Sequence, residues 1–254
     1  MEWSVGWVQL CTVLGWVGMI LLAAFEFRNS EFREGLWKDR VRARRNWSYL
    51  TMTALVMPIF RPLIQWVDAH VPHAIDFSQL PFWVDLVGTF VVAEALNWFV
   101  HWAKHRHDFL WKFHFQHHRE TQFNLWLTAH THGGEVLVSG TAIAVMMSAI
   151  GFSVDASLIY LAFYGVTTAY QHSSQIHSLG PLDWIIVSPR YHRIHHEVGM
   201  QANYAGRLTL FDLLLGTAVW PHSRKADEQR ALGIGENAME PYGFFKEWMY
   251  FLKS

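Results

Sequence analysis

The chain has 254 residues, 52% of them hydrophobic, and its formal net charge is -1 when histidine is counted as neutral. The apolar residues fall in long runs separated by charged stretches, which indicates an integral membrane protein rather than one or two soluble domains. The single cysteine, Cys11, lies within the first apolar run, so a disulfide framework and a cysteine-based metal site are both excluded. Histidine, with 16 copies, is the residue type left in quantity to bind a transition metal.

Residues 4–25 contain no charged side chain and are long enough to cross a bilayer core of about 30 Å. No basic segment precedes this run and no convincing cleavage site follows it, so we expect a retained span rather than a signal peptide. Seven Lys and Arg residues within 28–45 predict a basic loop on the cytoplasmic side of the membrane. A nucleic-acid-binding patch is not expected in a segment that connects two apolar runs.

A second apolar run extends from Trp47 to Trp66 and a third from Phe82 to Val100, with a polar loop between them. Glu94 lies in the last two turns of the third run, where a carboxylate is costly unless it has a partner. Because Glu94 precedes His101 by two helical turns, we expect it to accept the N–H of a metal-bound imidazole. The alternative is a structural carboxylate that pairs with an arginine or with Asn97.

Histidines at metal-ligand spacing follow in two groups. The first group lies within HWAKHRHDFLWKFHFQHH and the second within YHRIHH, which repeats the H-x-x-H-H spacing. These residues are His101, His105, His114, His117 and His118 in the first group, and His192, His195 and His196 in the second. Each buried imidazole needs partners for both of its nitrogens, so packing alone does not explain this density. The repeated pattern predicts a metal site that is closed from two sides.

We therefore expect a single all-α integral membrane domain with about four to five transmembrane helices and a histidine-rich helical cap in the cytoplasm. Its expected parts are spans one to three within 1–100, histidine boxes one and two within 101–134, a helical hairpin at 135–171, and the third histidine box with the cap at 172–254. The break near residue 151 leaves a re-entrant piece as the alternative to a hairpin. Within the cap, residues 244–252 could form an amphipathic helix on the bilayer surface.

These motifs resemble the fatty acid hydroxylase / sterol desaturase superfamily of membrane di-iron oxygenases. The family's L-W-x-x-H-x-x-H-H is similar to LWKFHFQHH at 110–118, and its A-x-x-A-H-P-x-E is similar to LTAHTHGGE at 127–135. Its Q-H-S-N and P-x-x-H-R-x-H-H elements are similar to residues 171–196, and its N-Y-G and W-D-x-x-x-G-T tail to NYAGRLTLFDLLLGT at 203–217. The resemblance covers about half of the chain. Departures such as Trp102 for the usual Arg leave the substrate open.

The resemblance implies which residues form the site. The implied metal ligands are His101, His105, His114, His117, His118, His132, His172, His192, His195 and His196, and His177 is left open. Glu94 and Glu135 are the carboxylates expected to support them. Asn203, Asp212 and Thr217 are expected to be structural, because an Asp before a Gly-Thr turn more often fixes a loop than takes part in chemistry.

The chemistry of the donors narrows the reaction. Eight or more imidazoles suit iron, zinc, copper or nickel rather than Mg²⁺ or Ca²⁺, and zinc is saturated by four ligands, so two metal ions are expected. Two iron ions could supply the electrons needed to split O2, which zinc cannot, although purified protein could contain zinc. We therefore expect hydroxylation or desaturation of a lipid C–H bond, with O2 as co-substrate.

Three further expectations concern partners and place. The chain contains no electron-carrier segment, so a separate electron-donor protein is expected. The compact chain suits a bacterial inner membrane, with the metal site on the cytoplasmic side. A di-zinc membrane hydrolase or isomerase that acts on a lipid in the same histidine cage stays open as the alternative. A bis-histidine cytochrome and a metal transporter fit less well, because the histidines gather at the ends of the spans.

Overall fold

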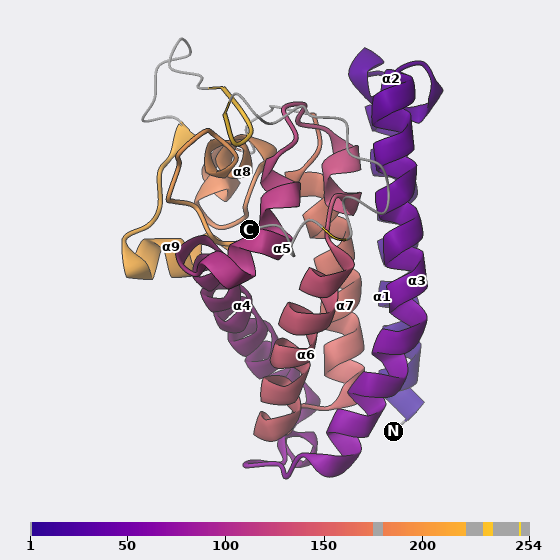
Figure 1. The fold of residues 1–254 in the computed structure, drawn as a ribbon. Helices are drawn as coiled ribbons and strands as arrows, with labels where there is room; N and C mark the ends of the chain where they lie inside the picture. The colour runs from indigo at the N-terminus through magenta and orange to yellow at the C-terminus, as the bar shows by residue number, and fades with distance from the viewer. Residues whose placement is uncertain (1, 175–179, 222–230, 236–248, 250–254) are drawn as a thin grey trace.

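The computed structural model describes residues 2–174, 180–221, 231–235 and 249. Four helices run side by side along the length of the molecule, and a fifth leans against them (Figure 1). The four are α1 (Glu2–Glu26), α3 (Arg40–His70), α6 (Gly133–Ile150) and α7 (Val154–Gln171), and the fifth is α4 (Phe82–Arg106). Within the described ranges the secondary structure is helical apart from two isolated β-bridges. The expectation of an all-α membrane protein is confirmed.

Three of these helices are long and apolar enough to cross a membrane. They are α1 from Gly6 to Glu26, α4 and α6. Helix α3 packs against α6, and α7 packs against α1. The expected total of four to five spans is therefore not confirmed, although α3 and α7 run alongside the three candidates.

The basic segment at 28–45, expected as a loop that connects two spans, is largely helical. Helix α2 (Ser30–Trp37) occupies its centre, and α3 already begins at Arg40. Two polar side chains explain these starts. Asn29 accepts a hydrogen bond from the backbone of Glu31, and Asp39 caps α3 in the same way.

Helices α6 and α7 are joined by a tight connection at the end of the molecule opposite to the histidines. Gly151 ends α6 in the left-handed region, with φ of 88°, and a Cβ atom there would collide with the carbonyl oxygen of Ile75. Ser153 then caps α7 by accepting from the backbone of Ala156. The break that the sequence indicated is thus a turn between two antiparallel helices.

The opposite end of the molecule carries the shorter elements (Figure 1). They are α5 (Asp108–His118), η2 (Leu125–Ala129), η3 (Gly180–Trp184), α8 (Pro189–His195) and α9 (Leu210–Leu215). We call this group of elements the cap. The expected amphipathic helix at 244–252 lies outside the described residues, apart from Met249.

Candidate metal centre

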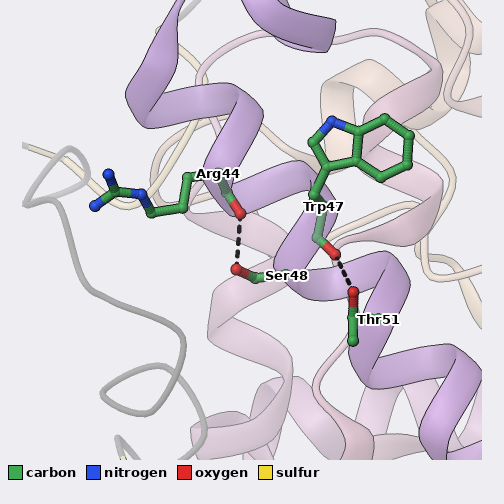
Figure 2. A pocket seen from close by; sticks show the side chains of 4 residues that line it. All are labelled: Arg44, Trp47, Ser48 and Thr51. Carbon is green, nitrogen blue, oxygen red and sulfur yellow. Dashed lines mark hydrogen bonds between the residues drawn. The ribbon is translucent and has the colours of Figure 1, made fainter.

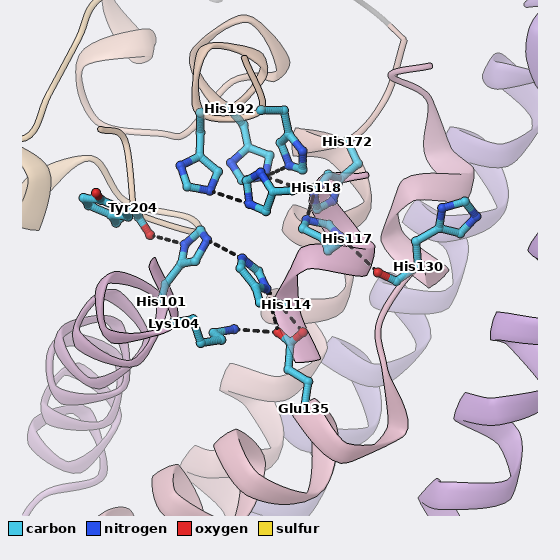
Figure 3. A network of polar contacts seen from close by, with 12 residues as sticks. His101, Lys104, His114, His117, His118, His130, Glu135, His172, His192 and Tyr204 are labelled. Atoms are coloured by element: carbon cyan, nitrogen blue, oxygen red, sulfur yellow. Dashed lines mark hydrogen bonds and ion pairs between the residues drawn. The ribbon is translucent and has the colours of Figure 1, made fainter. Parts of the chain in front are cut away.

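Nine histidine side chains from α4, α5 and α8 and from the C-terminal end of α7 gather in two clusters, and Figure 3 labels several of them. In each cluster, one ring nitrogen of every member lies within 4.8 Å of the others. The first cluster contains His101, His105, His114, His118 and His195, and the second contains His117, His172, His192 and His196. The structure therefore brings together residues from the first, second and third histidine boxes.

Helical periodicity determines which histidine joins which cluster. His114 and His118 are four residues apart and share one face of α5, whereas His117 projects from a neighbouring face into the second cluster. Helix α8 divides its histidines between the clusters in the same manner. The repeated H-x-x-H-H spacing thus serves both clusters at once.

The two clusters contact each other through stacked imidazole rings. The imidazoles of His118 and His196 stack with centroids 4.4 Å apart and planes inclined by 17°. Those of His114 and His117 stack at 5.3 Å. Two metal ions bound here would be neighbours within one centre.

Backbone carbonyl groups fix the protonation of the first cluster. Nδ1 of His101 donates to the carbonyl oxygen of Tyr204 at 2.7 Å, and Nδ1 of His195 donates to that of Ala202 at 2.8 Å. A carbonyl oxygen can only accept, so the proton of each neutral ring is on Nδ1. Both rings consequently present a bare lone pair on Nε2.

The second cluster is fixed in the same way from other elements. Nδ1 of His172 donates to the carbonyl oxygen of Thr168 at 2.8 Å, and Nδ1 of His117 donates to that of His130 at 3.3 Å. The Nε2 atoms of His117 and His172 lie 3.2 Å apart. Two bare lone pairs at this distance repel each other, unless a cation lies between them.

The nitrogen spacing matches the size of a transition-metal site. Ligands at right angles around a metal with bonds of about 2.1 Å lie about 3.0 Å apart. The five Nε2 pairs that face each other are separated by 3.0 to 3.2 Å. Imidazole donors suit iron, zinc, copper or nickel rather than Mg²⁺ or Ca²⁺. The donor set therefore fits one transition-metal ion in each cluster.

Within the two clusters, three rings have buried nitrogens without a hydrogen-bond partner. They are both nitrogens of His105 and the Nδ1 atoms of His192 and His196. Buried polar atoms are almost always paired, so each of these needs an explanation. For His105, a metal ion in the first cluster would satisfy one of the two nitrogens.

Burial keeps these rings in the neutral form that binds metals. Loss of solvation lowers the pKa of His195 to about 4 and the pKa of His172 to about 3. Burial, followed by repulsion from neighbouring histidines, lowers the pKa of His118 and of His192 well below 6.5. Both clusters therefore present lone pairs at neutral pH.

A buried carboxylate supports the first cluster from α6 (Figure 3). Nδ1 of His114 lies 3.2 Å from both carboxylate oxygens of Glu135, and Nζ of Lys104 lies 2.5 Å from Oε1. The carboxylate fixes the tautomer of His114 and increases the electron density of its ring, while Lys104 balances the charge. Sequence reasoning missed Lys104, although a lysine in the last turn of an apolar span was a signal.

One turn holds the two carbonyl groups that orient the first cluster. Asp212 accepts hydrogen bonds from the backbone of Tyr204 at 3.0 Å and of Ala205 at 2.9 Å. Asn203 adopts a left-handed conformation with φ of 58° between the carbonyls of Ala202 and Tyr204. Asp212 and the backbone of Asn203 thus shape the turn that orients His101 and His195, although both residues lie outside the two clusters.

The end of α1 carries a buried carboxylate that contacts segments next to the centre. Glu26 has no exposed surface, and its Oε1 accepts from the backbone N–H of Ser174 at 2.7 Å and from its hydroxyl at 2.9 Å. Its Oε2 accepts from the backbone of Leu125 at 3.3 Å. Glu26 therefore ties α1 to the segments beside His172 and η2. The sequence signal was an acid that ends an uncharged span.

The structure gives Glu94 a different role from the one expected. Its carboxylate accepts from Arg207 at 2.6 Å, from the hydroxyl of Tyr160 at 2.7 Å and from the backbone of Leu208 at 3.1 Å. It contacts no imidazole among these partners, so the alternative of a structural carboxylate paired with arginine is the observed one. The carboxylate that contacts a cluster ring is Glu135.

His132 also differs from its expected role as a ligand. It is the N-cap of α6, where its Nδ1 accepts from the backbone of Gly134 at 2.9 Å, and it lies outside both clusters. The neighbouring His130 contacts Asn46 through Nε2 at 2.7 Å. The position left open at His177 lies outside the described residues.

A shallow pocket on α3 is separate from this centre (Figure 2). It is lined by Arg44, Trp47, Ser48 and Thr51. The hydroxyl groups of Ser48 and Thr51 donate to carbonyl oxygens one turn earlier, at 2.7 and 2.8 Å. The pocket therefore offers no cluster of unpaired polar groups for catalysis.

Known proteins resemble this chain over its histidine-rich part. An alkylglycerol monooxygenase of Xenopus tropicalis is 30% identical over 145 residues, which are 56% of this chain and 31% of that protein. An ornithine lipid hydroxylase of Rhizobium tropici is 30% identical over 147 residues, 55% of this chain and 43% of that protein. A methylsterol monooxygenase of Rattus norvegicus is 27% identical over 160 residues, which are 58% of this chain and 52% of that protein. The chain thus spans between a third and about a half of the length of these relatives.

No solved structure matches the chain. A sequence profile described as fatty acid hydroxylase matches residues 86–217, which is just over half of the chain. The matched region contains every member of the two histidine clusters, together with Glu135, Asn203 and Asp212. This chain belongs to the fatty acid hydroxylase family.

Proposed function

We propose that this protein is a membrane-bound oxygenase that holds one iron ion in each cluster and hydroxylates an unactivated C–H bond of a lipid. The observation that carries this proposal is the pair of adjacent clusters, with five and four imidazoles whose lone pairs face one another. The names of the relatives support the lipid substrate and favour hydroxylation over desaturation. Dioxygen is the proposed co-substrate.

Iron is favoured over zinc by the number and spacing of the donors. Zinc sites are usually saturated by four ligands in a tetrahedron, in which neighbouring nitrogens lie more than about 3.3 Å apart. Five donors in the first cluster and nitrogen spacings of 3.0 to 3.2 Å suit a six-coordinate ion better. Two iron ions would supply the electrons for cleavage of dioxygen, which a pair of zinc ions cannot do.

The residues of the chain perform the orientation and charge control. Carbonyl groups of the 202–205 turn, of Thr168 and of His130 hold the rings with Nε2 directed inward. Glu135 holds the proton of His114 at Nδ1, and the ammonium group of Lys104 balances its charge. Burial of the rings excludes bulk water, which protects the centre from side reactions.

The position of the clusters explains how a lipid could reach them. Helix α4 is a candidate span, and it carries His101 and His105 in its last turns. A chain of a lipid in the adjoining leaflet could therefore approach the first cluster without leaving the membrane. We place this side in the cytoplasm of a bacterial inner membrane, where a separate electron-donor protein would reduce the centre.

The test is metal analysis of the purified protein together with oxygen uptake after loading with ferrous iron. Reductant and vesicles of total lipid extract are supplied, and the lipids are examined for added oxygen by mass spectrometry. We expect about two metal ions per chain and uptake that depends on lipid. The His195→Ala variant provides the matched control, because it removes one donor from the first cluster.

Two results would contradict the proposal. Two tightly bound zinc ions that resist replacement, with lipid hydrolysis or isomerisation in the absence of oxygen, would establish the di-zinc alternative. Absence of any bound transition metal would reject both forms of the metal centre.

A further inference from the structure

Two short segments of the cap expose apolar side chains beside α4. One segment is 180–187, which contains η3, and the other is 207–216, which contains α9. Six of their side chains keep 46% to 69% of their surface exposed: Leu182, Trp184, Ile185, Leu213, Leu214 and Leu215. We call this surface the apolar ledge. An exposed apolar surface of this extent commonly marks contact with a protein or a membrane.

The two segments form one structural unit. The backbone N–H of Val187 donates to the carbonyl of Arg207 at 2.8 Å, and that of Thr209 donates to the carbonyl of Ile185 at 3.0 Å. The hydroxyl of Thr209 also donates to the carbonyl of Trp184 at 2.6 Å. The apolar side chains of the ledge are therefore held on a common backbone framework.

The charged side chains of this unit are buried and its apolar side chains are exposed. A surface that faces water has the opposite arrangement. Asp183, Arg207 and Asp212 are 4%, 3% and 0% exposed, while leucine, isoleucine and tryptophan lie outside. Arg207 pairs with Glu94 of α4. Charged groups inside and apolar groups outside are the arrangement expected of a surface that faces hydrocarbon.

Contacts with α4 determine where the apolar ledge lies along the length of this candidate span. Nε1 of Trp98 donates to Asp212 of α9 at 2.8 Å, and Glu94 accepts from the backbone of Leu208. Trp98 lies 16 residues beyond Phe82, the first residue of the candidate span. At a rise of 1.5 Å per residue this is about 24 Å, within a hydrocarbon core of about 30 Å. Figure 1 shows α9 beside α4, below the level of α8.

We propose that the apolar ledge is inserted into the membrane leaflet on the side of the histidine clusters, where it contacts phospholipid acyl chains. Helix α4 also exposes apolar side chains, among them Val91 and Phe99. Helix α9 then lies in the leaflet like an interfacial helix and anchors the cap through Asp212. This placement holds whichever metal and reaction the clusters support.

A fluorescent label at position 214 tests the insertion. Cys11→Ser removes the single cysteine, and Leu214→Cys then carries an environment-sensitive NBD group in vesicles of dioleoylphosphatidylcholine. Spin-labelled phospholipids quench the label from within the bilayer, and iodide quenches it from water. Val91→Cys, on the exposed face of α4, is the control within the membrane, and Lys38→Cys, on an exposed residue after α2, is the control in water.

The expected result is blue-shifted emission at position 214, with strong quenching by acyl-chain spin labels and at least about threefold less quenching by iodide than at position 38. Quenching by iodide as strong as at Lys38→Cys would overturn the proposal, because the ledge would then face water. Energy transfer between labelled copies that increases with protein density, without quenching by lipid, would also overturn it in favour of a second copy of the chain.

Discussion

The two histidine clusters are built from the same kind of ring but are supported differently. In the first cluster, a buried carboxylate contacts His114 and a buried lysine contacts that carboxylate. In the second cluster, carbonyl groups orient His117 and His172, and the Nδ1 atoms of two further rings have no hydrogen-bond partner. The first ion would therefore have a carboxylate in direct contact with one of its rings and an ammonium group on that carboxylate, whereas Glu135 and Lys104 act on the second cluster only from a distance, through His117. Two ions bound in these clusters would therefore not be equivalent.

Removal of one ring from each cluster should have the largest effect. His195→Ala in the first cluster and His117→Ala in the second should each abolish oxygenase activity and lower the metal content by about one ion per chain. Metal analysis and oxygen uptake on protein still inserted in the membrane measure this. His107→Ala is the control, because His107 is exposed and lies outside the clusters. Full activity in either cluster variant would show that the affected ring is not a ligand.

Acid should destabilise the metal-free protein through both clusters. Burial lowers the pKa of His195 to about 4 and of His172 to about 3, against about 6.5 in the unfolded chain. Between these values the unfolded chain binds more protons, so stability is complete above pH 6.5 and declines as the pH falls toward 4 and 3. Thermal unfolding of chelated protein in detergent measures the slope.

Removing one titrating ring at a time separates the contributions of the two clusters to this acid response. His195→Asn and His172→Asn should each make the stability of metal-free protein less sensitive to pH, because each removes a ring that the unfolded chain protonates first. His107→Gln should leave the slope unchanged. Equal slopes in all four proteins would show that burial of these rings does not control the acid response.

Replacing the carboxylate should affect one cluster only. Glu135→Gln keeps the size of the side chain but removes the charge that supports His114, so metal affinity at the first cluster should fall roughly 10- to 100-fold. Competitive metal titration with a chelator resolves the two sites. The second cluster should keep its affinity, since its rings are oriented by carbonyl groups instead. Equal weakening at both sites would contradict the assignment of Glu135 to one cluster.

Spacings of three and four residues and long apolar runs are local signals, so they predicted the helices and eight of the nine cluster members, and the family resemblance added the ninth, His172. His101, His105 and the histidines of LWKFHFQHH all lie in the clusters. Glu94 and His132 make contacts other than the expected ones. For Glu94, a separation of seven residues from His101 does not show what packs opposite. Glu94 faces Arg207, which comes 113 residues later. A partner so distant in sequence becomes visible only in the folded chain.

The groups that orient the cluster rings could not be predicted from the sequence, for a second reason. The backbone carbonyls of Ala202, Tyr204 and Thr168 orient three cluster rings. Every residue has a backbone carbonyl, so the sequence does not indicate which carbonyls take part. Asp212 was recognised as a structural residue before a Gly-Thr turn, yet its connection to the first cluster passes through the backbone of Tyr204. Residues that act through main-chain atoms need the fold before their role can be inferred.

Lys104 offers the finest test of the difference between the clusters. Lys104→Met should leave the negative charge of Glu135 uncompensated in a buried site. The uncompensated carboxylate would increase the electron density of the His114 ring, and this would alter the first ion without removing a ligand. We expect metal content close to normal, a severalfold loss of turnover and a changed spectrum of the first site in cobalt-substituted protein. Lys104→Arg keeps the positive charge and should restore the spectrum, although its bulk can lower stability. If Lys104→Met changes only the thermal midpoint while the spectrum stays that of the parent protein, the lysine serves packing rather than the electronic environment of the first cluster.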